Sequence, residues 1–381
     1  VLYLGRLMPY IYELFRRFCC GKLRERRRRL TKEKPAFMTR FILTLVLSAA
    51  TSIAVAQLDY STHDGSAPYV QPSETTVDGI LDRYGSFKGA VLNMTREEWE
   101  IIRSWEAYDH SEAKRILKEH KDKWQAAHAD EIAERKASRM LITTSGCDCW
   151  VEPDESYTQI TEDDQFYLSG AGINVDYSTE PIPMGFDFEM YGQTFSEFYL
   201  NSKGSISFDD YTIDWTPEEF PFTTDEVYQI AGFWGDSDYR VSGEVYYKIT
   251  QNEVFINFVD VGYYNQGEDL FNSYQIIITS DDSDYLPGDA NTQMCYLNMD
   301  WAHGDIGGSN GCCGNTPATV GMDTPGDTGP YLQFGRFNTL DDVYNGPAGS
   351  GDGYDDGVNW LDYRSFIMNS EGDTELSLIH I

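Results

Sequence analysis

The sequence of 381 residues is poor in histidine and in positive charge, with 6 His and 29 Lys and Arg against 62 Asp and Glu. A histidine-based catalytic triad or a histidine-rich metal site is therefore poorly supplied. The chain has no G-x-S-x-G nucleophile motif, and its Gly-rich stretches lack the context of a phosphate-binding loop or a dinucleotide fingerprint. The acidic excess repels phosphate backbones, which argues against nucleic acid as a partner.

Long apolar runs are also scarce, and the run Phe41–Leu47 is too short to span a bilayer as a mature helix. It follows Met38-Thr-Arg and precedes Ala54-Val55-Ala56. A charged start, an apolar centre and an A-x-A end are typical of a secretory signal peptide. We therefore expect a signal peptide at residues 38–56 with cleavage after Ala56, and no transmembrane helix in the mature fragment.

Two terminal segments are expected to lie outside the natural protein. Residues 1–37 open on Val and contain the basic run Arg24–Arg29, so we interpret them as translated upstream sequence. The alternative is a genuine basic cytoplasmic tail before a signal anchor. Residues 376–381 look like the translation of a sequencing-library adapter. We therefore expect the natural sequence to be cut near Glu375.

Removal of residues 1–56 takes away 12 basic and 3 acidic residues, so 17 basic and 59 acidic residues remain, a net charge near −42. A surface with this charge keeps a protein soluble, tolerates high salt and attracts divalent cations. Residues 57–77 form a polar leader rich in Ser, Thr, Pro and Gly, which we expect to be extended.

The expected mature chain has an odd number of cysteines. An exported protein keeps disulfides, so one thiol should stay free or pair outside the chain. Cys147 and Cys149 could form disulfides with Cys312 and Cys313, although spacing alone leaves the connectivity open. A zinc site is the rival interpretation, and it is weak because the spacings are C-x-C and C-C. The disulfide candidates are Cys147, Cys149, Cys295, Cys312 and Cys313.

Residues 78–145 have the periodicity of helices. Thr95-Arg-Glu-Glu98 is a capping box, in which the Thr side chain accepts from the third helical amide and the Glu reaches back. Apolar residues of the following segment fall on one helical face, among them Ala113, Ile116, Leu117 and Trp124. The region predicts a helical hairpin or a long helix with a break.

After Cys149 the period changes to two, which predicts strands. Asn201-Ser-Lys-Gly204 separates two such runs and predicts a hairpin with Gly204 at a positive φ. The fold class is therefore mainly β with an N-terminal α region, in which an antiparallel β-sandwich or open barrel follows a helical segment. The clearest alternating runs are Val245–Ile249, Val254–Val259, Tyr274–Ile278, Cys295–Trp301 and Ala318–Met322.

The order of these elements resembles the nidogen-like extracellular (NIDO) domain. The motifs that carry the likeness span about residues 181–340. They are Tyr191-Gly192, Asn201–Phe208, Phe220-Pro221, Ala231–Asp236, Gly243–Tyr247, Asn272–Ile278, Trp301 and Ala318–Asp327. The resemblance implies a NIDO-like β-sandwich over residues 146–370, in a matrix or adhesive protein without catalysis. It carries over no site residue, and the helical region before Cys147 has no counterpart in the family pattern.

Calcium is the cofactor that the acidic turns favour, because short Asp-rich turns supply several hard oxygen ligands at once. The alternative is a set of solvated turns, since Asp and Gly are default turn residues. Asp281, Asp282 and Asp284 form a further turn of this kind. The candidate calcium ligands are Asp236, Asp238, Asp352, Asp355 and Asp356.

Together these features predict a secreted or cell-surface, non-catalytic adhesion or matrix-type protein that binds an extracellular protein or glycan. Tyr263, Tyr264 and Tyr354 fall in expected loops where they could face such a partner. The alternative is a secreted carbohydrate-binding or carbohydrate-active protein, since two carboxylates suffice for glycoside hydrolysis. A third hypothesis is a structural domain within a larger surface protein.

Overall fold

The computed structural model describes residues 74–103, 105, 108–144, 149–161, 165–166, 176–222, 227–304, 311–314, 316–347, 356–370 and 379–380. All of these residues lie in one compact unit, Gln71–Ile381. The expected signal peptide, its cleavage after Ala56 and the upstream segment lie outside the described residues and stay predictions.

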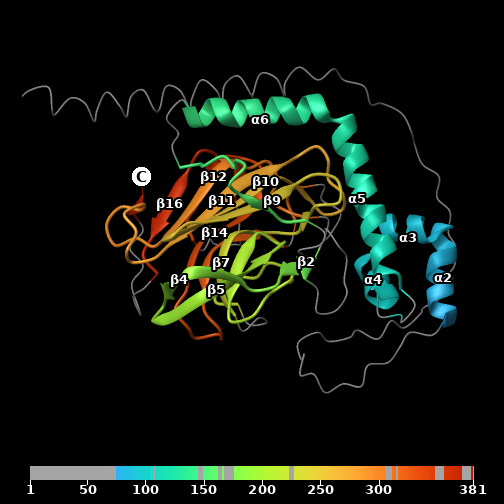
Figure 1. Ribbon diagram of the computed structural model, residues 1–381, viewed down its shortest axis with the longest axis horizontal. Coiled ribbons are helices and arrows are strands. Elements are labelled where there is room, and N and C mark those ends of the chain that lie inside the picture. The colour runs from blue at the N-terminus through green and yellow to red at the C-terminus, as the bar shows by residue number, and fades with distance from the viewer. Residues whose placement is uncertain are drawn as a thin grey trace, which may run out of the picture. The chain divides into compact units, whose positions relative to one another are not determined.

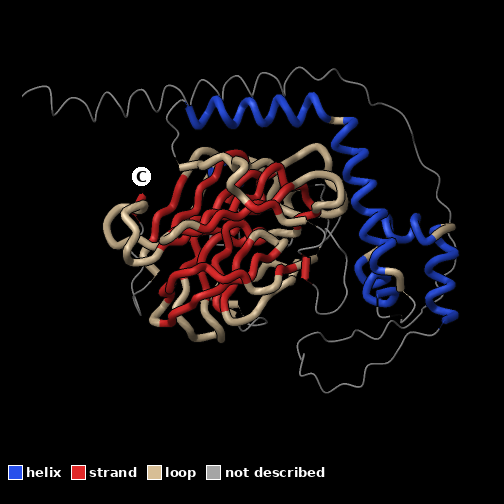
Figure 2. Tube along the Cα trace, in the orientation of Figure 1, coloured by secondary structure: helices blue, strands red, loops and turns tan. Residues whose placement is uncertain are grey.

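The described strands form two sheets, which confirms the predicted mainly β fold with a helical N-terminal region (Figures 1 and 2). Neighbouring strands of the first sheet run antiparallel, and β8 (Ser237–Asp238) also pairs with β10. In spatial order the first sheet contains β1 (Thr158–Gln159), β9 (Glu244–Ile249), β10 (Glu253–Tyr263), β11 (Asn272–Thr279), β12 (Thr292–Asn298), β16 (Ser365–Met368) and β17 (Ile379–His380).

The second sheet is also antiparallel, except that β14 and β15 pair in parallel. Its remaining member, β4 (Ile182–Met190), pairs with β5. In spatial order the sheet contains β15 (Asp356–Gly357), β14 (Leu332–Thr339), β13 (Ala318–Asp323), β7 (Tyr228–Trp234), β6 (Ser205–Phe208), β5 (Gln193–Asn201), β3 (Ser178–Thr179) and β2 (Gln165–Phe166).

The core lies between the two sheets and is built from alternate residues of each strand, as the period of two predicts. Phe258 of β10 stacks on Tyr274 of β11 with ring centroids 4.7 Å apart. From the other sheet, Phe233 of β7 meets Trp301 edge to face at 5.4 Å. Strand β10 is buried along almost its whole length, so both of its faces are covered. Burial of these side chains is the main term that stabilises the sandwich.

The β5–β6 hairpin forms as predicted, and Gly204 has a φ of +89°. A Cβ at this position would lie 2.1 Å from the carbonyl oxygen of Phe233, so both the backbone conformation and the space require Gly. The turn is pressed against the neighbouring strand β7. As a result the side chain of Lys203, one residue earlier, points into the protein and is only 1% exposed.

Five described helices, here called the helical arm (residues 74–144), precede the sandwich (Figure 1). The predicted capping box forms: the amide of Glu98 donates to Thr95 Oγ1 at 3.3 Å, and the amide of Thr95 donates to Glu98 Oε2 at 3.1 Å. None of the described helices is long and apolar enough to cross a bilayer. The helices are α2 (Glu74–Tyr84), α3 (Phe87–Asn93), α4 (Arg96–Arg103), α5 (His110–Ala127) and α6 (Ala129–Thr144).

The helical arm has a hydrophobic core of its own, separate from the core of the sandwich. The predicted apolar face of α5 contributes Ala113, Ile116 and Leu117, while Trp124 turns instead toward Phe271 of the sandwich. The first part of the arm therefore buries its apolar side chains within itself rather than against the sandwich. The rest of this core is Val77, Ile80, Ala90, Val91, Met94, Trp99, Ile102 and Tyr108.

Candidate functional site

The helical arm contacts the sandwich through a line of charged and polar pairs, here called the seam. Its arm side carries Arg96, Lys121, Trp124, Arg135 and Arg139. The chain has few basic residues, and four of them lie at this one interface. We therefore take the seam as the candidate functional site.

Arg96 lies at the centre of the most buried part of the seam. It is the first residue of α4, so the capping box fixes its backbone. Its Nε and Nη2 donate to the two carboxylate oxygens of Asp176, both at 3.1 Å. Its Nη1 donates to Asp236 Oδ2 at 2.9 Å, and Nη2 also donates to Asp236 Oδ1. Two-pronged pairing of a guanidinium with a carboxylate is the strongest form of this contact.

Two aromatic rings cover the guanidinium of Arg96. Its central carbon lies 3.8 Å from the ring centroid of Tyr264 and 4.7 Å from that of Trp215. A cation over an aromatic face gains additional electrostatic attraction when water is excluded. Tyr264, which the sequence placed in a loop facing a partner, therefore faces the protein's own arm. Tyr263 is the last residue of β10 and is buried, so its predicted exposure is wrong.

Lys203 supplies a second cation to the same two carboxylates. Its Nζ lies 2.6 Å from Asp176 Oδ1 and 3.1 Å from Asp236 Oδ1, and it also donates to the carbonyl of Ser237 at 2.8 Å. Two buried carboxylates thus face two buried cations, and the cluster is neutral. A buried ion pair is stable only when such pairing is complete.

The cluster perturbs the ionisation of its members in the direction that pairing predicts. Burial alone would raise the pKa of Asp176, but the charges of Arg96 and Lys203 outweigh it and lower the pKa to about 2. Burial alone would lower the pKa of Arg96, and the two carboxylates instead raise it well above its usual value. Both groups are therefore charged at neutral pH.

A second buried pair, Asp238 with Arg240, lies next to this cluster. Arg240 Nη2 donates to Asp238 Oδ2 at 2.6 Å and its Nε donates to Oδ1 at 3.0 Å. Although burial opposes it, the charge of Arg240 lowers the pKa of Asp238. Arg240 and Gln266 also donate to the carbonyl of Leu92 at the end of α3, which adds two hydrogen bonds between sandwich and arm.

Farther along the seam, α5 and α6 contact β10 and the loops next to β9 and β10. Arg135 Nε and Arg139 Nη1 donate to the carboxylate of Asp260 at 3.1 and 2.9 Å. The indole of Trp124 donates to Glu268 Oε2 at 2.6 Å. Lys121 donates to the carbonyl of Gly243 at 2.6 Å. The basic side of the arm therefore matches an acidic strip of the sandwich along its length.

A groove of about 660 Å³ lies between α6 and the sandwich. Its walls mix both signs of charge with one large aromatic side chain, Tyr246, whose hydroxyl donates to Glu244 Oε2 at 2.7 Å. A hollow with an aromatic surface and several charged groups can bind the side chains of a protein or the hydroxyls of a glycan. Lining residues include Arg135, Lys136, Glu152, Glu155, Glu244 and Tyr246.

The candidate calcium ligands are not brought together in the described structure. Cationic side chains take the places beside the carboxylates of Asp236 and Asp238, and Asp356 accepts from the amides of Arg336 and Asn345 at 3.2 and 2.7 Å. Asp352 and Asp355 lie outside the described residues. Within the described part of the chain, no group of three or more His, Cys, Asp or Glu is arranged to hold a metal. Calcium binding stays a prediction, which a shift in Tm on adding Ca²⁺ after EDTA would test.

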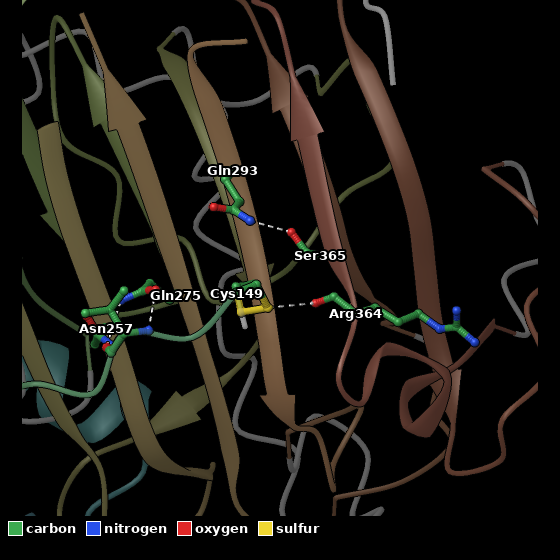
Figure 3. Close-up of a disulfide and its surroundings, with 8 residues drawn as sticks. Cys149, Asn257, Gln275, Gln293, Arg364 and Ser365 are labelled. Carbon is green, nitrogen blue, oxygen red and sulfur yellow. Dashed lines mark hydrogen bonds between the residues drawn. A yellow bond between two sulfur atoms is a disulfide. The ribbon is translucent and has the colours of Figure 1, made fainter. Parts of the chain in front are cut away.

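The structure gives the cysteines a pairing that differs from the one suggested by their spacing. Cys149 pairs with Cys295 of β12, and Cys312 pairs with its neighbour Cys313. Cys147 lies outside the described residues. Beside the first disulfide, Gln293 of β12 donates to Ser365 Oγ of β16 at 2.6 Å (Figure 3). The disulfide thus joins the segment before β1 to an interior strand of the first sheet.

Asp323, at the end of β13, is a buried carboxyl held by neutral donors. The amides of Phe222 and Thr324 donate to it at 2.7 and 2.8 Å. These hydrogen bonds favour the charged form, but burial outweighs them and raises the pKa of Asp323 to about 7. The carboxyl therefore keeps its proton in the folded protein over a range in which the unfolded chain has lost it.

We expect this carboxyl to make the folded protein less stable as the pH rises from about 4 to about 7. The stabilisation from the protonated Asp323 carboxyl is complete below pH 3.8, the pKa in the unfolded chain. It is lost above about pH 7, the pKa in the folded protein. The loss should be on the order of 2–4 kcal/mol. Asp323→Asn should flatten the curve of unfolding free energy against pH, whereas the same change at exposed Asp281 should leave the curve as it is. An unchanged slope in Asp323→Asn would reject the assignment.

Sequence comparison relates the sandwich to known proteins. Residues 151–280 match a family model described as NIDO related. The chain is 31% identical to alpha-tectorin of Mus musculus over 81 residues, 30% identical to that of Homo sapiens over 81 residues, and 27% identical to that of Gallus gallus over 122 residues. These stretches are 21%, 21% and 31% of this chain but only 4%, 4% and 6% of the tectorins. No solved structure matches the chain significantly.

Proposed function

We propose that the protein is an extracellular, non-catalytic protein of the matrix type that acts by adhesion to another extracellular protein or glycan. The match of residues 151–280 to the NIDO-related family is the observation that carries the proposal. The similarity to alpha-tectorin supports it, although the matched stretches are a small part of those proteins.

Two features of the structure agree with this proposal. The disulfide between Cys149 and Cys295 suits an oxidising compartment outside the cytosol. The buried carboxylates of the seam are neutralised by Arg96, Lys203 and Arg240, an arrangement that stabilises a fold rather than one that leaves an acid and a base ready for glycoside hydrolysis. The groove beside α6 is where we place the contact with the partner.

The proposal can be tested with the full chain, produced through a secretory route and applied to surfaces coated with matrix proteins and to a glycan array. We expect saturable binding to at least one class without release of sugar. Tyr246→Ala should weaken this binding, whereas Tyr331→Ala, a matched change at an exposed position outside the groove, should not. Sugar release abolished by one carboxylate change would support the carbohydrate-active alternative, and absence of binding to every class would reject adhesion.

A further inference from the structure

The surroundings of Arg96 belong almost entirely to the sandwich. Asp176 precedes β3, Trp215 lies between β6 and β7, Asp236 joins β7 to β8, and Tyr264 follows β10. Hydrogen bonds within the sandwich hold these walls. The amide of Tyr264 donates to the carbonyl of Asp236 at 2.8 Å, so that two of the walls are connected directly. The space around the guanidinium is therefore shaped by the sandwich and only filled by the arm.

The space that Arg96 fills needs a positive charge to be electrically neutral. Without Arg96 the sandwich would keep two buried carboxylates, those of Asp176 and Asp236, against the single ammonium of Lys203. A buried negative charge without a partner is strongly destabilising. The empty space would therefore bind a positive group more readily than water.

The shape of the space selects a guanidinium from among the possible cations. The two carboxylates accept from the three nitrogens of the planar guanidinium, and its central carbon lies over the rings of Tyr264 and Trp215. A planar fork that stacks on aromatic faces is a property of arginine, whereas the ammonium of lysine is a compact, strongly hydrated charge. A lysine side chain would neutralise the space without matching it.

The part of the arm that carries Arg96, helices α2–α5, is built to separate from the pocket as one unit while α6 stays beside the groove. Its first four helices share a core of their own, and its contacts with the sandwich are mainly the polar pairs of the seam. While the arm stays attached, Arg96 has the advantage of a high effective concentration near the space that it fills. A ligand from outside therefore has to displace the α4 end of the arm or wait until that end separates from the sandwich.

We propose that Asp176, Asp236, Trp215 and Tyr264 form an arginine-binding pocket of the sandwich, in which Arg96 is the resident ligand and the arginine side chain of an extracellular protein partner can take its place. The existence of the pocket is independent of the proposed function, and its use by a partner rests on that function. The arm then acts as a built-in competitor of the partner.

The pocket is tested with Arg96→Ala and the probe N-acetyl-L-arginine amide. Millimolar probe should raise the Tm of Arg96→Ala saturably and leave the wild type unchanged, because the wild type already contains the ligand. N-acetyl-L-lysine amide at the same ionic strength should bind at least about 10-fold more weakly. Arg115→Ala, which removes an exposed arginine of α5, should respond like the wild type. Equal responses of Arg96→Ala to both probes, or none, would overturn the pocket.

Further variants keep the test decisive. If Arg96→Ala does not fold alone, refolding it with each probe replaces the Tm measurement, and recovery that does not distinguish arginine from lysine rejects the pocket. Adding Asp236→Asn to Arg96→Ala should abolish the response to the arginine probe. In the matrix-binding assay, Arg96→Ala should bind its partner about 10-fold more tightly and the arginine probe should compete. A pocket that binds the probe without changing partner affinity rejects its use by the partner, whereas a failure of all matrix binding concerns the proposed function alone.

Discussion

Lys203→Met is expected to lower the free energy of unfolding by about 3–5 kcal/mol. The change keeps most of the side-chain volume but removes the ammonium that lies between Asp176 and Asp236. Arg96 then faces two buried carboxylates, and one negative charge is left without compensation. Urea unfolding at neutral pH, followed by the fluorescence of the buried tryptophans, measures the loss.

Two comparisons separate this electrostatic effect from a general effect of the substitution. Lys118→Met, at a position where the side chain is 61% exposed, should change the stability by less than about 0.5 kcal/mol. Combining Lys203→Met with Asp176→Asn restores the charge balance and should recover part of the loss. If Lys203→Met costs less than about 1 kcal/mol, water reaches the cluster and its burial is not the source of its strength.

Loss of the Cys149–Cys295 disulfide is expected to lower the stability by roughly 2–5 kcal/mol, because the bond closes a long loop of the unfolded chain. The two cysteines are separated by 146 positions in the sequence. In a protein of this size such a loss corresponds to a decrease in Tm of roughly 5–15 °C. Thermal unfolding of a variant with both cysteines replaced by Ala measures it.

The second disulfide provides the matched comparison. Cys312 and Cys313 are adjacent, so their bond closes no loop, and replacing both by Ala should change the Tm little. Reductant should lower the Tm of the wild type toward that of Cys149→Ala/Cys295→Ala and should have almost no effect on that variant. A wild type that is insensitive to complete reduction would contradict the structural role of the first bond.

Much of the fold could be predicted from local patterns. Strands β9, β11, β12 and β13 lie where apolar and polar residues alternate, because every second side chain points into the core between the sheets. Strand β10 lies where apolar residues occur on both faces, and both of its faces are covered. Gly204 and the capping box of Thr95 and Glu98 were also identified, since both are defined by residues only a few positions apart. The start of the arm differs from the prediction: α2 begins at Glu74, whereas the helical region was expected to start at residue 78.

The seam could not be predicted in this way, because its members are distant in the sequence. Arg96 and Asp236 are 140 positions apart, and each has a simpler local explanation, as a residue of a helix start and of an acidic turn. Lys203, in a Gly-containing turn, has the sequence context of a solvated residue, and only its packing against β7 buries it. One sequence signal could have drawn attention to Arg96 and Lys203, namely the small number of Lys and Arg residues. In so acidic a chain, each basic side chain has many carboxylates with which it can pair.

The position of the Cys149–Cys295 bond also determines how mechanical tension would travel through the protein. A pull applied to the arm would reach the sandwich at Cys149, ahead of the short edge strand β1. The covalent bond passes that tension directly to β12, an interior strand paired on both sides, so the edge strand β1 and its neighbour β9 are bypassed. Under such a pull, the ion pairs of the seam would separate before the hydrogen-bonded strands of the sheet do.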